Sequence, residues 1–174
     1  MKILLVKPIS DIHVVSPPLA LAYLASSLKK LDVEVKILDC LFKKFTYADF
    51  KKYLREFNPD VLGFTSFTME FKSALKMAEI AKSLNPKIKI VFGGPHVSNV
   101  PEESLKNKNI DFIFRAEAEE GFPQLIQELI NNKKNPNFKK IPNLGWKNKK
   151  KIVLNPIKFI ENLDALAFPD FDLL

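Results

Sequence analysis

Short apolar runs alternate along the chain with longer stretches whose apolar residues recur at helical spacing. This alternation is typical of βα units around a parallel sheet. The apolar runs predict strands over residues 2–7, 33–39, 61–66, 88–92 and 111–115. The stretches between and after them predict helices over residues 18–31, 46–57, 70–84, 101–106 and 121–131.

Consecutive parallel strands with right-handed crossovers predict a doubly wound α/β fold. Five strands favour a flavodoxin-like (Rossmann-like) sheet with the strand order 2-1-3-4-5. In that order the first and third strands are neighbours at the topological switch point, and ligands bind there, beyond the carboxyl ends of the strands. The segments to inspect are therefore residues 8–18, 65–71, 93–100 and 116–121.

The pattern changes after residue 131. Residues 144–147 and 151–154 predict a β-hairpin, and a tail punctuated by prolines follows over residues 155–174. We therefore divide the chain into a flavodoxin-like domain, residues 1–131, and a basic connection, hairpin and linker, residues 132–174. The tail is rich in apolar residues, so it either packs back onto the sheet domain or leads into another element.

The net charge of +7 does not indicate a nucleic-acid partner, because it is concentrated in one segment. Residues 131–151 hold eight lysines and no acid, which leaves 19 basic and 20 acidic residues in the rest of the chain. Lysines of this kind suit an exposed or edge strand, where they discourage pairing with another sheet. We expect no direct contact with nucleic acid.

Composition excludes several further classes of protein. Apolar residues make up 47% of the 174 residues, so the chain is not disordered. No apolar run reaches the length of a membrane span, and the first residues do not resemble a signal peptide, so we expect a cytoplasmic protein. Cys40 is the only cysteine, which excludes an internal disulfide and an iron–sulfur cluster bound by this chain alone. The glycine motifs of a dinucleotide site and of a P-loop are absent.

Two of the switch-point segments contain candidate binding residues. Gly93 and Gly94 directly follow the fourth strand and precede Pro95 and His96, and the missing Cβ atoms would let the backbone approach a bulky ligand. A tight turn is the alternative for this glycine pair. The third strand ends in a cluster of hydroxyls, which both donate and accept hydrogen bonds. This cluster consists of Thr65, Ser66 and Thr68 around Phe67, with helix capping as the alternative role of Thr68.

Ionisable side chains in the other segments are further candidates. Glu117 and Glu119 lie at the sheet rim, where they could bind a ligand's hydroxyls or amides or simply complement the following helix. His13 follows Asp11 in the first loop and is a candidate metal ligand, although a loop histidine is more often exposed to solvent. We find no nucleophile with an adjacent base, and therefore assign no catalytic residue.

Five segments, taken in order, resemble the N-terminal cobalamin-binding domain of cobalamin-dependent radical S-adenosylmethionine (SAM) enzymes. They are PPLALAYLA at 17–25, PDVLGFTS at 59–66, IVFGGPH at 90–96, RAEAEE at 115–120 and FIENLDALAFP at 159–169. The resemblance implies cobalamin in the switch-point crevice, with its nucleotide tail near the third and fourth strands and its corrin facing a catalytic domain. The implied cofactor-binding residues are Pro17, Pro18, Leu19, Thr65, Ser66, Phe67, Thr68, Gly93, Gly94, Pro95, His96, Glu117 and Glu119.

The resemblance also implies a larger parent enzyme. In that family a radical SAM barrel with a C-x-x-x-C-x-x-C motif follows, and S-adenosylmethionine and the iron–sulfur cluster would belong to that part only. This chain would then be the binding half of a methyltransferase or a related iron–sulfur oxidoreductase. We expect a bulky residue at Gly94 to weaken cobalamin binding without unfolding the domain.

The chain departs from the family pattern at several positions. Alanine stands at positions 20, 116 and 118, where the family commonly has glycine. Asp11 and His13 match the start of the D-x-H-x-x-G motif that supplies a lower cobalt ligand, but Ser16 replaces its glycine. The three alanines and the apolar tail leave open a cofactor-free scaffold or partner-docking domain. A flavin- or nucleotide-binding enzyme of the same fold is a third hypothesis.

Overall fold

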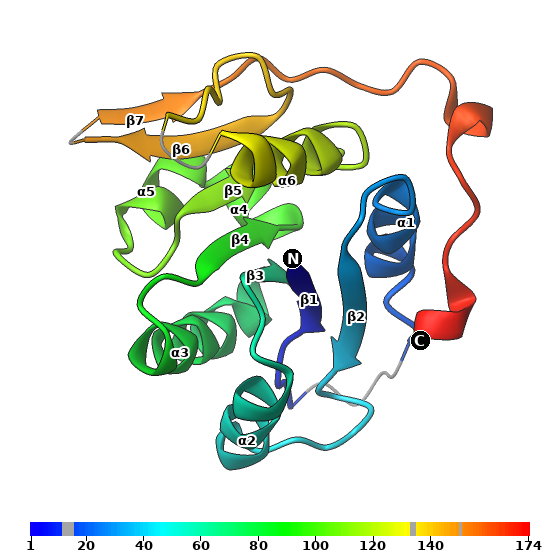
Figure 1. Ribbon diagram of the computed structural model, residues 1–174. Coiled ribbons are helices and arrows are strands. Elements are labelled where there is room, and N and C mark those ends of the chain that lie inside the picture. Colours follow the sequence, from blue (N-terminus) through cyan, green and yellow to red (C-terminus); the bar gives the residue numbers. More distant parts are fainter. Residues whose placement is uncertain (12–15, 133–134, 150) are drawn as a thin grey trace.

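The protein forms a single mixed sheet covered by helices on both faces (Figure 1). The computed structural model describes residues 1–11, 16–132, 135–149 and 151–174. The strands follow the order β2-β1-β3-β4-β5-β6-β7 across the sheet. Their bounds are β1 (Lys2–Lys7), β2 (Glu34–Asp39), β3 (Val61–Thr65), β4 (Lys89–Gly93), β5 (Phe112–Phe114), β6 (Leu144–Asn148) and β7 (Lys151–Leu154).

The first five strands are parallel and adopt the predicted order 2-1-3-4-5. The prediction of a five-stranded sheet with a separate hairpin is wrong in one respect, because β6 and β7 continue the same sheet. Phe112, Ile113 and Phe114 pair antiparallel with residues 146, 145 and 144 of β6. In the part of the chain that the structure describes, the sheet therefore has seven strands, and the division after residue 131 stays a prediction.

Helices cover the two faces unequally. One face carries α2 (Tyr47–Phe57), α3 (Thr68–Leu84) and two short helices, α4 (Pro95–Asn99) and α5 (Pro101–Lys106). The other face carries α1 (Leu19–Ser27) and α6 (Gly121–Asn131). Because β1 and β3 are buried on both faces, their residues are apolar almost without interruption, as expected for central parallel strands.

The sequence sets the ends of α2 clearly. Thr46 and Asp49 form a capping box, in which the Thr46 hydroxyl accepts from the Asp49 N–H and the Asp49 carboxylate accepts from the Thr46 N–H. Phe50, Leu54 and Phe57 then face the core. Asn58 ends the helix with φ 50°, a left-handed conformation that asparagine tolerates.

Two differences from the predicted helices concern the loops that matter for function. Helix α4 was predicted as loop, and α3 begins at Thr68 rather than at residue 70. The α3 terminus is capped by Glu70, whose carboxylate accepts the Phe67 N–H at 3.2 Å, and not by Thr68. Among the described residues no helix is long and apolar enough to cross a membrane.

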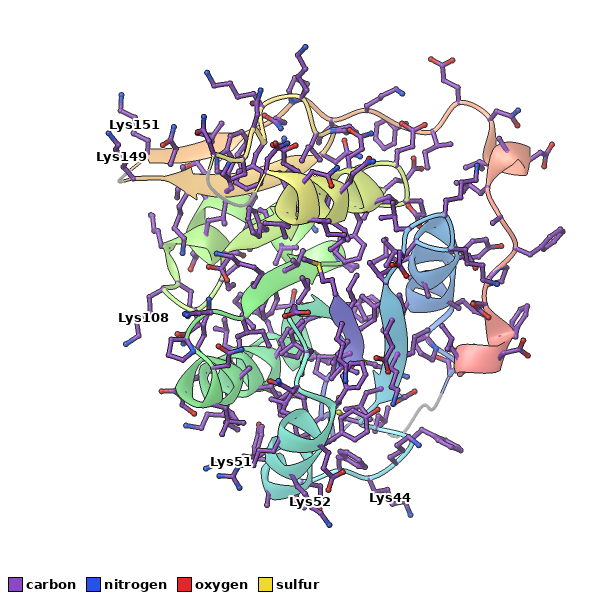
Figure 2. The ribbon with its side chains drawn as sticks, in the orientation of Figure 1. Lys44, Lys51, Lys52, Lys108, Lys149 and Lys151 are labelled. Atoms are coloured by element: carbon purple, nitrogen blue, oxygen red, sulfur yellow. The ribbon has the colours of Figure 1, made fainter. Side chains whose placement is uncertain are left out.

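The C-terminal tail packs back onto the domain. Figure 1 shows it leaving the hairpin, passing α6 and descending beside α1. It contains two 3₁₀ turns, η1 (Leu163–Ala165) and η2 (Phe171–Leu173). The Ser26 hydroxyl donates to the Phe168 carbonyl at 2.6 Å, which fixes the tail against α1. At the opposite end of the hairpin, Lys149 and Lys151 extend away from the sheet (Figure 2).

Candidate functional site

A cavity of about 380 Å³ lies at the carboxyl ends of β1, β3, β4 and β5, on the sheet face covered by α1 and α6. Its floor comes from four neighbouring strands. Leu5 lies beside Gly63, Gly63 lies beside Val91, and Phe114 extends the same face on β5. Glycine at position 63 contributes no side chain, and a Cβ there would come within 2.9 Å of the Leu5 Cδ2. The cavity therefore lies at the predicted switch point.

The α1 side of the cavity contains every residue predicted for it. Pro17, Pro18 and Leu19 all line the cavity, and Leu19 is partly exposed at its rim. Leu21 and Leu24 continue this wall along the helix. The wall is therefore almost entirely apolar.

The two adjacent glycines have different roles. Gly93 lines the cavity, and a Cβ built on it would have no neighbour closer than the Phe64 carbonyl oxygen at 4.0 Å. Gly94 has φ 96°, and a Cβ there would lie 2.8 Å from the Ser66 carbonyl oxygen and 2.9 Å from its nitrogen. Gly94 is thus needed by the backbone itself. The expectation that a bulky residue at Gly94 spares the fold is wrong, and Gly93 is the position where a side chain has room.

The hydroxyl cluster is split between the cavity and the adjacent core. Thr65 and Phe67 line the cavity, whereas Ser66 does not. The Ser66 Oγ is fully buried and has no hydrogen-bond partner in the described part of the chain. Thr68 points to α4, where its hydroxyl lies 3.2 Å from the His96 Nδ1.

His96 also lies outside the cavity lining. Its ring stacks on Phe71, with 3.8 Å between the ring centroids. Pro95, which precedes it, does line the cavity. The predicted set of residues from β3 and β4 is therefore brought together in space, but only part of it faces the cavity.

Lys7 and Glu70 line the cavity and were not predicted. The Lys7 ammonium donates to the Ser16 carbonyl at 2.8 Å and lies 3.5 Å from the Asp39 carboxylate, with both side chains largely buried. The position of Lys7 at the carboxyl end of the first strand was the available signal. One cation, Lys7, and two carboxylates, Glu70 and Glu119, thus lie in a mainly apolar lining that also contains Thr65.

The two predicted glutamates in the segment after β5 behave differently. Glu119 lines the cavity, and its carboxylate accepts the Ala118 N–H at 2.9 Å. Glu117 lies outside the lining, and its carboxylate accepts the Ile160 N–H of the tail at 2.6 Å. Ala116 has φ 55°, a conformation that favours glycine. The three alanines at positions where the resemblance implies glycine, Ala20, Ala116 and Ala118, line the cavity.

No preformed metal site is found among the described residues, since no group of three or more His, Cys, Asp or Glu side chains lies together there. His13, the candidate lower ligand of cobalt, lies outside the described residues. Cys40 is buried, and burial followed by the nearby Asp39 charge raises the pKa of its thiol to about 12. Its thiol is therefore protonated at neutral pH.

Comparison with known proteins identifies the family to which the chain belongs. The sequence model of the B12 binding domain matches residues 7–126, which is more than half of the chain. The chain belongs to the B12-binding domain family. The resemblance inferred from the sequence is thereby confirmed, and all residues that line the cavity except Leu5 lie within the matched segment of this B12-binding domain.

Its relatives are longer proteins. The domain is 36% identical to an uncharacterized methyltransferase of Pyrococcus horikoshii, PH0819, over 182 aligned residues, which cover the whole chain and 39% of the relative. It is 29% identical over 154 residues to cytidylyl-2-hydroxyethylphosphonate methyltransferase of Streptomyces wedmorensis, covering 75% of the chain and 29% of the relative. The B12-binding domain therefore spans less than half the length of these relatives.

Two solved structures share the fold. The cobalamin-dependent SAM radical enzyme OxsB, with aqua-cobalamin and S-adenosylmethionine bound, superposes with a TM-score of 0.83 at 20% identity, over 99% of this chain and 24% of that one. The radical SAM methyltransferase TsrM from Kitasatospora setae, with cobalamin and a [4Fe-4S] cluster bound, superposes with a TM-score of 0.76 at 21% identity. The superposition covers 89% of this chain and 30% of that one. At these identities the likeness establishes the fold.

Proposed function

We propose that this B12-binding domain holds the nucleotide tail of cobalamin in the cavity and presents the corrin ring to a separate catalytic domain. The observation that carries the proposal is the open cavity at the carboxyl ends of four parallel strands, with free space at the Cβ position of Gly93. This is the place where open α/β sheets bind their ligands.

The size and lining of the cavity support the proposal that the nucleotide tail enters it and the corrin ring stays outside. A volume of about 380 Å³ lies at the low end of the roughly 300–1,000 Å³ of small-molecule pockets. A complete cobalamin is too large for it, whereas the nucleotide tail is a compact group with one flat aromatic base. Leu5, Phe114 and Phe122 offer apolar contact for such a base, and Thr65 and Lys7 offer hydrogen-bond donors.

The reaction is proposed for the whole polypeptide rather than for this domain. Bound cobalamin supplies a cobalt centre that can carry a methyl group. The domain's residues bind and orient it, and we assign them no catalytic role. Because the relatives above are methyltransferases, we propose a cobalamin-dependent radical SAM methyltransferase as the parent, with S-adenosylmethionine and the iron–sulfur cluster held outside these residues.

The test is a titration with aquacobalamin, followed by the visible absorption of the cofactor. We expect a saturable spectral change with the unaltered protein. In the series Gly93→Ala, Gly93→Val and Gly93→Leu, affinity should fall stepwise as the side chain fills the cavity, with at least a tenfold loss for leucine. Ser83→Leu, an exposed change on α3 far from the lining, is the control. Absence of binding at high micromolar cobalamin would refute the proposal, and equal affinities across the series would refute the assigned position.

A cofactor-free scaffold is the second candidate, and two observations favour it. Three alanine methyl groups narrow the cavity at the family's glycine positions, and the tail exposes large apolar side chains, with Phe168 89% exposed. A scaffold would take up no cobalamin and would self-associate through the tail. Comparing the sedimentation of the protein with that of Phe168→Ser detects self-association through the tail, which only the scaffold function predicts. A flavin or nucleotide enzyme would instead be recognised by the absorption spectrum of the purified protein.

A further inference from the structure

The tail, residues 155–174, is hydrogen-bonded to both walls of the cavity. One anchor joins it to the segment after β5. There the Glu117 carboxylate accepts the Ile160 N–H at 2.6 Å. The Asn143 side chain donates to the carbonyls of Glu117, at 2.6 Å, and Lys158, at 2.9 Å, and accepts the Lys158 N–H at 2.6 Å. This anchor holds the wall that contains Ala116, Ala118 and Glu119.

The second anchor joins the tail to α1, the opposite wall. The Ser26 hydroxyl donates to the Phe168 carbonyl at 2.6 Å, and the Asp170 N–H donates to the Ala22 carbonyl at 3.1 Å. The Asp170 carboxylate also lies 3.0 Å from the Lys29 ammonium. Ser26 is buried, so its hydrogen bond is shielded from water. The turn of α1 just before this anchor lines the cavity through residues 19–21 and 24.

The tail is held by these polar contacts more than by burial of its large side chains. Phe159, Leu163, Phe168 and Phe171 are each more than 60% exposed, whereas Leu173 packs against the α1 and α6 side of the core. Loss of a single anchor should therefore release the adjoining part of the tail. The same loss should leave the core of the sheet intact.

The spacer between the anchors is short. From Ile160 to Phe168 there are eight residue steps, which reach about 28 Å when fully extended. The 3₁₀ turn Leu163–Ala165 shortens this reach, and the Asn162 side chain fixes the turn by accepting the Asp164 N–H at 3.1 Å. Among the described residues, the hydrogen bonds of the spacer, 161–167, join residues within the spacer itself.

We infer that the tail is a tether that sets the separation of the two cavity walls, and that Glu117 and Ser26 are positioning residues for the bound cofactor. This inference rests on the proposed function. A tether acts only while both ends hold, so release of either end frees the walls equally. The tether is expected to slow the departure of cobalamin, because the cofactor's tail leaves only when the walls can move apart.

The test is a double-mutant cycle on the rate at which bound aquacobalamin dissociates. Glu117→Ala and Ser26→Ala should each speed dissociation about three- to tenfold, the effect of one lost hydrogen bond. The double variant should dissociate no faster than the faster single variant, whereas the losses of unfolding free energy should add because the two residues share no hydrogen-bond partner. Ser27→Ala removes a hydroxyl that bonds only within α1, to the Leu24 carbonyl, and should leave the rate unchanged.

Two outcomes overturn the tether. If the fold-increases in dissociation rate of the two single variants multiply in the double variant, the two residues act as independent contacts. If the single variants dissociate at the unaltered rate, the tail does not restrain the walls. Amide hydrogen exchange gives a readout without the cofactor. Glu117→Ala should speed exchange at the N–H groups of Leu21 and Ala22, on the far wall, and unaltered exchange there refutes the coupling. Failure of the unaltered protein to bind cobalamin would refute the proposed function, while the exchange experiment still tests the tether.

Discussion

Replacing either of the two glycines after β4 by alanine provides a sharp stability test, because the structure predicts opposite outcomes for neighbouring positions. At Gly94, φ 96° and ψ 178° place the backbone in a region that is essentially restricted to glycine, which costs an L-residue about 1–3 kcal/mol. The new Cβ would also lie 2.8 Å and 2.9 Å from backbone atoms of Ser66, and relieving such overpacking costs about 1–3 kcal/mol. Gly94→Ala should therefore lower the free energy of unfolding by about 2–6 kcal/mol.

The same change at Gly93 meets no such obstacle. The nearest atom to its Cβ would be 4.0 Å away, and its backbone is not in the left-handed region. Gly93→Ala should leave stability unchanged or raise it by up to about 1 kcal/mol, because alanine restricts the unfolded chain. A loss of about 2–6 kcal/mol at Gly94 is a large part of the roughly 5–15 kcal/mol free energy of unfolding of a typical domain.

Urea unfolding followed by the fluorescence of Trp146 measures both changes. Trp146 is the only tryptophan and is buried beside the sheet, so its emission should report loss of tertiary structure. The midpoint should fall for Gly94→Ala and stay or rise for Gly93→Ala, with equal m-values. If the two variants unfold within about 0.5 kcal/mol of each other, the assignment of Gly94 to a backbone role fails.

Three further predictions follow from single contacts. Because burial raises the pKa of Cys40 to about 12, the folded state holds the thiol proton more tightly than the unfolded state. Stability should therefore fall as pH rises from 9 toward 12, and the fall in urea midpoint over this range should be smaller for Cys40→Ala. Thr46→Ala removes the cap of α2 and should cost about 1 kcal/mol in urea unfolding, whereas an unchanged midpoint would show that the capping box contributes nothing. Lys7→Met leaves the largely buried Asp39 carboxylate without its cation and should cost about 1–3 kcal/mol by the same assay, and a stabilised variant would contradict the pairing.

The parallel core could be predicted because its signals are local. Each strand is a short apolar run, each helix has its own apolar spacing, and strand order follows from crossover rules. The hairpin's place in the sheet could not be predicted in this way. Phe112 pairs with Trp146 across 34 residues, and nothing near either residue specifies the other. Helix α4 was missed because Gly93, Gly94 and Pro95 indicate a turn, although proline is also well suited to the first turn of a helix.

The candidate site could be located from the sequence more reliably than its individual contacts. Loops after parallel strands converge at one edge, so the cavity's position follows from the fold. The direction of each side chain depends on tertiary partners. Glu117 was predicted to contact a ligand, and that role stays a prediction, but in the fold its carboxylate accepts a tail N–H from residue 160. Lys7 was overlooked because its partner, Asp39, comes from a different strand.

The pairing of β6 with β5 has a consequence for local unfolding. Strand β5 has only three residues, and at a sheet edge so short a strand would open easily and carry the adjacent cavity wall with it. The hairpin instead gives β5 a hydrogen-bonded neighbour on each side, β4 and β6. The free edges of the sheet are therefore β2 and β7. Fraying should begin at those edges, which leaves the strand that supports Phe114 within the most cooperative part of the molecule.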